Sequence, residues 1–304
     1  MQPVLRGAIL IIGAELLFAA MGATVRHLSS WLDNELLVFC RNLVGLALLL
    51  PLLLPRARHR LTTRVAHLHL IRGIAGVSAM YCFFYALAHM PLADAMLLKL
   101  SAPLFIPMVA SVWLREPLTR LIVAAVALGF VGVTIILSPD FTNMAPVALI
   151  AVLGGLFAAI AKVAVRRLGR TEPAERIVFY FALSATLVSG VPMLWAERLP
   201  APELWPWLLA LGTLATAGQF LLTRGFAAAP AGRLAPFTYF SVVFAAILGW
   251  LFWDEALSIT TFAGTLLIMG AGLLVARRSH AEQPLPARPV ARPDDIHPAE
   301  PVPR

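Results

Sequence analysis

Charged residues are scarce in this chain of 304 residues, at 13% of the sequence, about half their usual share in globular proteins. Hydrophobic residues make up 60%, against roughly 45–50% in a typical globular domain. This composition excludes an ordinary soluble enzyme or nucleic-acid-binding domain. The apolar residues form segments long enough to cross a bilayer, about 17–25 residues each, so the sequence predicts an all-α polytopic membrane protein.

Motifs that would carry chemistry are missing from the sequence as well. It has no G-x-x-x-x-G-K-[ST] loop to hold the phosphates of ATP, no H-E-x-x-H and no G-x-S-x-G. Its two cysteines, Cys40 and Cys82, both fall inside apolar segments, where buried inert thiols are expected and a disulfide is left open. The sequence therefore predicts no catalytic residue, no metal site and no cofactor.

Ten apolar segments separated by charged, proline or glycine residues are predicted to span the membrane: 7–27, 35–54, 68–89, 92–114, 119–138, 145–165, 176–195, 204–224, 231–252 and 257–276. With a cytoplasmic N-terminus, fifteen arginines up to and including Arg278 fall on the inner side and two on the outer side. This asymmetry follows the positive-inside rule. The net charge of +8 is therefore interpreted as a topology signal in an inner membrane, with both termini cytoplasmic and no nucleic-acid partner.

The chain repeats itself at an offset of 139 residues. Pro91 then aligns with Pro230, and Glu116 with Glu255, each in the same order of spans and turns. Five spans per half is an odd number, so the second half must enter the membrane from the opposite face. The predicted domains are a five-helix repeat at 7–138, a second, inverted five-helix repeat at 145–276, and a disordered cytoplasmic tail at 277–304. Inverted repeats are a common construction of secondary transporters.

The second to fifth spans resemble a known family. Phe39-x-Arg41, Phe84-Tyr85-Ala86-Leu87 followed by Met90-Pro91-Leu92-Ala93-Asp94-Ala95, Ala102-Pro103-Leu104-Phe105 and then Glu116 are similar to the EamA branch of the drug/metabolite transporter superfamily. The resemblance covers about residues 5–278 and implies ten transmembrane helices that transport a small metabolite. The Pro-Leu-Ala-Asp-Ala turn looks most like the subgroup with the riboflavin and S-adenosylmethionine carriers. The second half departs from this pattern at the matching turn, where Ala231-Gly232-Arg233 occurs.

Charges at membrane depth are candidates for function because each is costly in the bilayer. Glu15 lies about eight residues, roughly 12 Å, into the first span, and Arg41 and Lys99 lie at similar depth in the second and fourth. A substrate site would use these charges with aromatic rings of Tyr81, Tyr85 and Tyr239. The alternatives are a neutral, hydrogen-bonded Glu15, paired or snorkelling cations and aromatic residues that only pack.

Other polar residues are predicted to be structural. Arg72 and Lys162 are near span ends and can snorkel, and Asp94 is placed to cap the fourth span. Glu116 and Glu255 occupy matching turns, where they either cap a hairpin or act as a gate by pairing with arginines. Glycines such as Gly132 and those from Gly264 onward indicate close helix packing, and Pro103, Pro107 and Pro236 are candidate bends.

The function predicted from the sequence is secondary transport of a small polar or amphipathic metabolite, of amino-acid, nucleobase or vitamin type, by alternating access. The alternative is a membrane-embedded enzyme acting on a lipid or prenyl substrate, which would need clustered carboxylates or a His/Asp set. The expected partners are the small-molecule substrate and the lipid bilayer. A coupling proton and a homodimer are left open.

Overall fold

The computed structural model describes residues 3–57, 62–115, 118–137, 141–172, 174–195, 200–228, 235–256 and 258–281. The first half contains α1 (Pro3–Leu28), α2 (Asn34–Ala57), α3 (Ala66–His89), α4 (Leu92–Lys99), α5 (Ala102–Trp113) and α6 (Arg120–Leu137). The second half contains α7 (Phe141–Leu168), α8 (Ala174–Gly190), α9 (Trp205–Ala228), α11 (Phe240–Trp253) and α12 (Ile259–Ala281), with 3₁₀ turns η2 (Pro192–Trp195), η3 (Pro202–Leu204) and η4 (Ala235–Tyr239).

The fold is all-α, as predicted. Seven segments of the described chain are long and apolar enough to cross a membrane, and the helices at 120–135, 237–253 and 259–271 are shorter but also apolar. The helices coincide with the ten predicted spans, α4 and α5 together forming the fourth. Cys40 and Cys82 are free thiols. The tail from residue 282 onward, part of the predicted disordered segment, lies outside the described residues.

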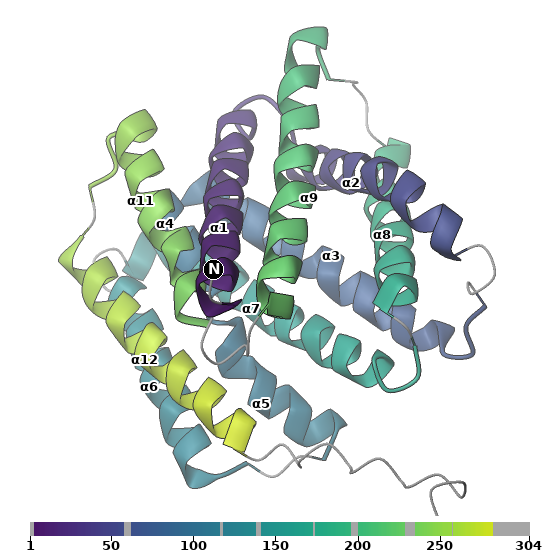
Figure 1. Cartoon of the computed structure of the whole chain (residues 1–304). Helices are drawn as coiled ribbons and strands as arrows, with labels where there is room; N and C mark the ends of the chain where they lie inside the picture. Colours follow the sequence, from purple (N-terminus) through teal and green to yellow (C-terminus); the bar gives the residue numbers. More distant parts are fainter. Residues whose placement is uncertain are drawn as a thin grey trace, which may run out of the picture.

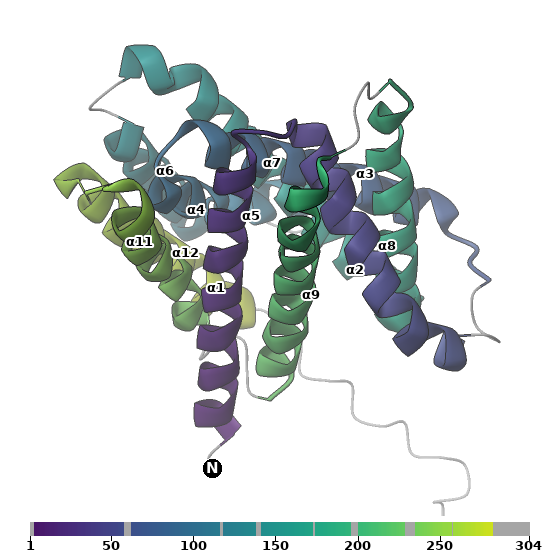
Figure 2. The same cartoon turned by 90° about the horizontal axis from the view of Figure 1, so that it is seen from above.

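The packing of the helices follows the sequence repeat. Helix α1 packs along α9 and α3 along α7, while α6 and α12 pair at one side of the bundle (Figure 1). Since α1 corresponds to α7 and α3 to α9 in the repeat, α1–α9 and α7–α3 are two copies of one interface. The view from above shows the α6–α12 pair and the α2–α8 pair on opposite sides (Figure 2). The two halves therefore interlock instead of forming separate bundles.

Small residues allow close helix contacts, as predicted for Gly132 and Gly264 and as also found for Gly154. A Cβ atom at Gly132 of α6 would lie 2.9 Å from the carbonyl oxygen of Gly264 on α12. A Cβ atom at Gly154 of α7 would lie 2.8 Å from the Cβ atom of Cys82 on α3. Larger residues would force these helices apart, so the glycines set the separation within both pairs.

The fourth span is interrupted next to Lys99. Helix α4 ends at that residue, and α5 begins at Ala102 after a turn in which the Leu100 N–H donates to the Leu97 carbonyl at 2.9 Å. The physical reason is Pro103, which has no N–H to bond the Lys99 carbonyl four residues earlier. The bend expected at Pro103 is confirmed, and it leaves two half-helices whose ends meet inside the bundle.

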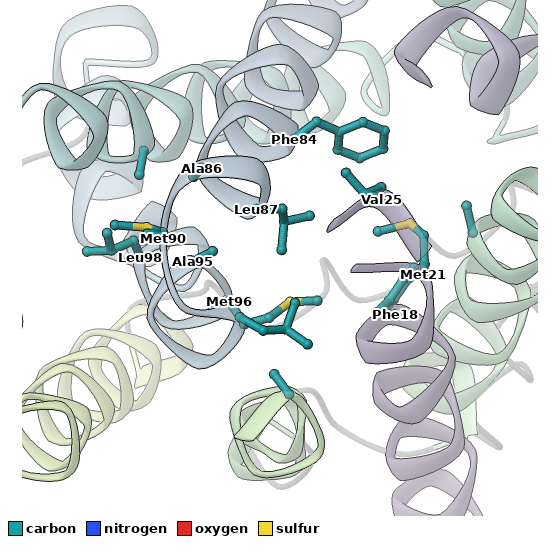
Figure 3. Packing of buried hydrophobic residues seen from close by; sticks show 14 of the residues in the cluster. Phe18, Met21, Val25, Phe84, Ala86, Leu87, Met90, Ala95, Met96 and Leu98 are labelled. Carbon is teal, nitrogen blue, oxygen red and sulfur yellow. The ribbon is translucent and has the colours of Figure 1, made fainter. Parts of the chain in front are cut away.

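Apolar side chains fill the space between α1, α3 and α4 toward the end of the bundle where α1 ends. Phe18, Met21 and Val25 of α1 face Leu87 of α3 and Met96 of α4 (Figure 3). All five are at least nine-tenths buried. This packed region lies directly beyond the charges described next.

Candidate functional site

Glu15 is the acidic member of a group of charges inside the bundle. Its side chain lies on α1 and the residue is only 6% exposed. Its carboxylate interacts electrostatically with the ammonium groups of Lys99 on α4 and Lys162 on α7. Glu15, Lys99 and Lys162 belong to three different helices, α1, α4 and α7.

Lys99 is held between two aromatic rings at the break in the fourth span. Its Nζ lies 4.9 Å from the ring centroid of Phe18 on α1 and 4.8 Å from that of Phe83 on α3. Cation–π attraction offsets part of the cost of removing this ammonium from water. The C-terminal end of α4, where carbonyl groups concentrate, also favours a cation at this position.

Arg41 and Arg72 extend the group of charges onto α2 and α3. The Arg41 Nη1 donates to Asn42 Oδ1 at 2.8 Å, and Asn42 Nδ2 donates to Ser189 Oγ on α8 at 3.2 Å. The guanidinium of Arg72 lies 3.7 Å from the ring centroid of Phe181, also on α8. The positive charge of Arg41 acts repulsively on both Arg72 and Lys99.

These residues are referred to below as the central charge cluster, which consists of Glu15, Arg41, Arg72, Lys99 and Lys162. The sequence had placed Arg72 and Lys162 among the snorkelling residues near span ends. In the structure Lys162 is exposed, but it interacts electrostatically with Lys99, Arg72 and Glu15 and is grouped with them for that reason. Sequence position gave the depth of each residue but not the direction in which its side chain points.

The tyrosines of the predicted site occupy other places. Tyr81 and Tyr85 line a cavity of about 400 Å³ together with Asn34, Glu35, Cys82, Ile150 and Pro192. None of Glu15, Arg41 and Lys99 lines this cavity. Tyr239 is buried at the end of η4. The aromatic rings that contact Lys99 and Arg72 are instead those of phenylalanines. Nothing in the sequence pattern had distinguished these phenylalanines from others in the spans.

Glu255 ties together three segments at the end of the bundle where α1 ends. It forms a salt bridge with Arg26, the side chains being 15% and 20% exposed. Its Oε2 also accepts a hydrogen bond from the Leu92 N–H at 2.8 Å, at the first residue of α4. Arg26 donates in addition to the Met90 carbonyl. One ion pair therefore joins α1, the α3–α4 turn and the α11–α12 turn.

Two further predictions concern these turns. Asp94 does not cap the N-terminus of α4, as had been expected. The carboxylate that accepts the Leu92 N–H there is Glu255, from the second half of the chain. Asp94 instead accepts a hydrogen bond from Thr261 Oγ1 of α12 at 2.8 Å, which adds a second link between the same turns. Glu116, which matches Glu255 in the repeat, lies outside the described residues.

Beyond the C-terminal ends of α2 and α7, the buried carboxylate of Glu172 joins two loops. Thr63 Oγ1 donates to Glu172 Oε1 at 2.8 Å, and Arg176 Nη1 donates to Glu172 Oε2 at 2.5 Å. Burial alone would raise the pKa of Glu172, but these hydrogen bonds and the charge of Arg176 outweigh it and hold the pKa below its usual range. Glu172 is therefore a charged connection between the α2–α3 and α7–α8 loops.

Comparison with known proteins agrees with this architecture. The model of the EamA-like transporter family matches residues 5–138 and again residues 145–277. The chain belongs to the EamA-like transporter family. It is a polytopic membrane protein of a family that transports small metabolites, built from two copies of the family unit.

Named relatives cover nearly the whole transporter. The pseudopaline exporter of Pseudomonas aeruginosa strain UCBPP-PA14 is 35% identical over 274 residues, covering 89% of this chain and 96% of the relative. The riboflavin transporter of Brucella anthropi is 28% identical, covering 81% and 89%. A crystal structure of a protein has a TM-score of 0.62 at 23% identity, covering 91% of this chain and 99% of the other, which shows the fold alone.

Proposed function

We propose that this transporter moves a small amino-acid-like metabolite across the inner membrane by alternating access, with the central charge cluster as its substrate site. The observation that carries the proposal is Lys99, which lies at a break in a membrane-spanning helix between two aromatic rings and interacts with the buried Glu15. Broken helices near the midplane are where many secondary transporters bind their substrates.

The chemistry of the cluster suits a molecule that carries both an acid and an amine. A substrate carboxylate would contact the ammonium of Lys99, while a substrate ammonium would contact Glu15. Phe18 and Phe83 would contact the apolar part of the molecule. Relatives are named for different solutes, so the substrate class is proposed from these residues and not from any relative.

Glu15 is also the proposed site of a coupling proton. It is a buried acidic residue at membrane depth, a position at which carboxyl groups commonly serve as proton relays in transporters. A transporter that couples the movement of a proton to that of its substrate leaves both of them chemically unchanged. We accordingly propose that the protein is not an enzyme, in agreement with the transporter names of its relatives.

Counterflow in proteoliposomes tests the function. Vesicles containing the purified transporter and preloaded with one amino-acid-like solute should accumulate the same labelled solute transiently, and the label should be recovered chemically unchanged. Relatives are named both for export and for uptake, and counterflow reports exchange in either direction. The absence of counterflow for all solutes of a bacterial extract, or recovery of a modified product, would contradict the proposal.

The proposed topology places both termini in the cytoplasm and the Arg26–Glu255 salt bridge at the outer face. It is supported by the fifteen-to-two distribution of arginines. Single cysteines replacing Asp33 or Ala201 should react with an impermeant maleimide added to whole cells, whereas a cysteine at Gly169 should react only after permeabilisation. Labelling of residue 169 in intact cells would refute both the topology and the inverted repeat.

A further inference from the structure

The central charge cluster carries more positive than negative charge. Its cations come from four helices, with Arg41 on α2, Arg72 on α3, Lys99 on α4 and Lys162 on α7. In the described part of the chain, Glu15 is the one carboxylate that acts electrostatically on Lys99 and Lys162. The cluster therefore has three positive charges in excess.

Cation–π contacts do not remove this excess. Phe18 and Phe83 contact Lys99, and Phe181 contacts Arg72. These rings lower the cost of holding the cations away from water, but a ring brings no negative charge. Four like charges inside one bundle repel one another, and the repulsion is strongest where water is excluded. Binding of an anion would consequently stabilise the cluster.

The hydrogen-bond donors around the cluster point to carboxylates. The Arg72 Nε is buried and has no partner among the described residues, and the same is true of the Ser101 hydroxyl, two residues beyond Lys99. Within the described residues Arg41 donates to Asn42, which uses one of the five hydrogen bonds that a guanidinium can donate. Lys162 is exposed, although it interacts electrostatically with the buried Glu15. Planar guanidinium groups with free donors match carboxylates in two-point contacts.

We propose that the central charge cluster binds an amino-polycarboxylate, a solute with one amine and at least two carboxylates. One carboxylate is held at Lys99 and Arg41 and another at Arg72 and Lys162, with the amine at Glu15. A monocarboxylic amino acid would leave the second pair of cations without a counter-charge. This inference rests on the proposed function and specifies the substrate class of the same site.

A series of three probes isolates the number of carboxylates. Glycine, iminodiacetate and nitrilotriacetate each have one nitrogen and carry one, two and three carboxymethyl groups. Binding to the purified transporter in nanodiscs is followed by the shift of its thermal unfolding with probe concentration in metal-free buffer. The apparent Kd should fall about tenfold or more with the second carboxylate, and should not rise with the third. A Kd that does not change across the series overturns the inference.

Two variants and a matched control assign the effect to the cluster. Arg72→Gln and Lys162→Met should each abolish the gain in affinity from the second carboxylate, so that iminodiacetate binds no more tightly than glycine. Arg224→Met removes a cation that stacks on Phe220 of α9 at 4.2 Å and is not among the groups that act on Glu15, Lys99 or Lys162, so it should keep the gain in affinity. An equal loss in Arg224→Met would overturn the assignment, and if a variant does not fold, the wild-type series alone decides.

Binding and transport separate this inference from the function on which it rests. Counterflow of some solute without preference for polycarboxylates would leave the transporter function standing and refute the substrate class. Polycarboxylate binding without any counterflow would support the site and refute the transport proposal.

Discussion

Glu15→Gln is expected to abolish transport while the protein still inserts and folds. Glutamine keeps the shape and most of the hydrogen-bonding capacity of glutamate, so a Glu15 that served only in packing would tolerate the change. A Glu15 that binds a proton or a substrate amine would not, because the amide carries no charge opposite Lys99 and Lys162. Without the carboxylate that binds the proton or the substrate amine, the initial rate of counterflow should fall about 100-fold or more, which corresponds to roughly 3 kcal/mol.

The measurement compares Glu15→Gln with two further proteins. Glu203→Gln neutralises an exposed acid in η3 and should transport at the wild-type rate. Lys99→Met removes the cation that faces Glu15 and should fail in the same way as Glu15→Gln. Thermal unfolding and size-exclusion profiles show whether each protein is folded. Normal counterflow by both Glu15→Gln and Lys99→Met would refute a substrate role for the cluster.

The fold could be predicted from the sequence because hydrophobicity alone determines which segments enter a bilayer. The break between α4 and α5 could also be located, since Pro103 cannot donate the hydrogen bond that a continuous helix needs. The repeat was visible because turns at Pro91 and Pro230 recur at one offset. These are local properties of the chain, and they do not depend on which helices become neighbours.

The site could be predicted only in part, because depth in the membrane does not fix the direction of a side chain. On α3, Arg72 and Phe83 are eleven residues apart and differ by ~20° around the helix, whereas Tyr81 lies ~180° from Arg72. The structure accordingly brings Arg72 and Phe83 to the central charge cluster, while Tyr81 lines another cavity. The helical pattern groups these residues into faces, but only the packing of α3 against α1, α7 and α8 shows which face meets the charges.

The Arg26–Glu255 pair is a second contact that the sequence could not predict, because its two residues are far apart in the chain. The repeated acidic turns suggested pairing with an arginine, but nothing in the sequence connected Glu255 with Arg26, 229 positions away. In the structure the pair joins the two halves of the repeat. The Leu92 N–H donates to the same carboxylate, so the pair also fixes the start of α4, the half-helix that ends at Lys99.

Glu255→Gln is expected to open the outer end of the bundle. An amide oxygen still accepts the Leu92 N–H, so the cap on α4 is retained, whereas the ion pair with Arg26 is lost. Because both side chains are partly exposed, solvent screening reduces the loss to about 1–3 kcal/mol. The equilibrium between closed and open forms should therefore shift about 10- to 100-fold toward the open form.

A cysteine placed directly behind the pair measures this shift. Val25, the neighbour of Arg26 on α1, is fully buried, so Val25→Cys in a background without Cys40 and Cys82 should react slowly with an impermeant maleimide added from outside. Adding Glu255→Gln should raise the labelling rate about 10- to 100-fold, in proportion to the open population. Asp254→Asn is the matched control, since it neutralises the neighbouring exposed acid and asparagine tolerates the positive φ of 54° at that position. If both variants label Val25→Cys at the wild-type rate, the Arg26–Glu255 pair is only a structural cap of α4, and the outer closure depends on the apolar contacts of Met21, Leu87 and Met96.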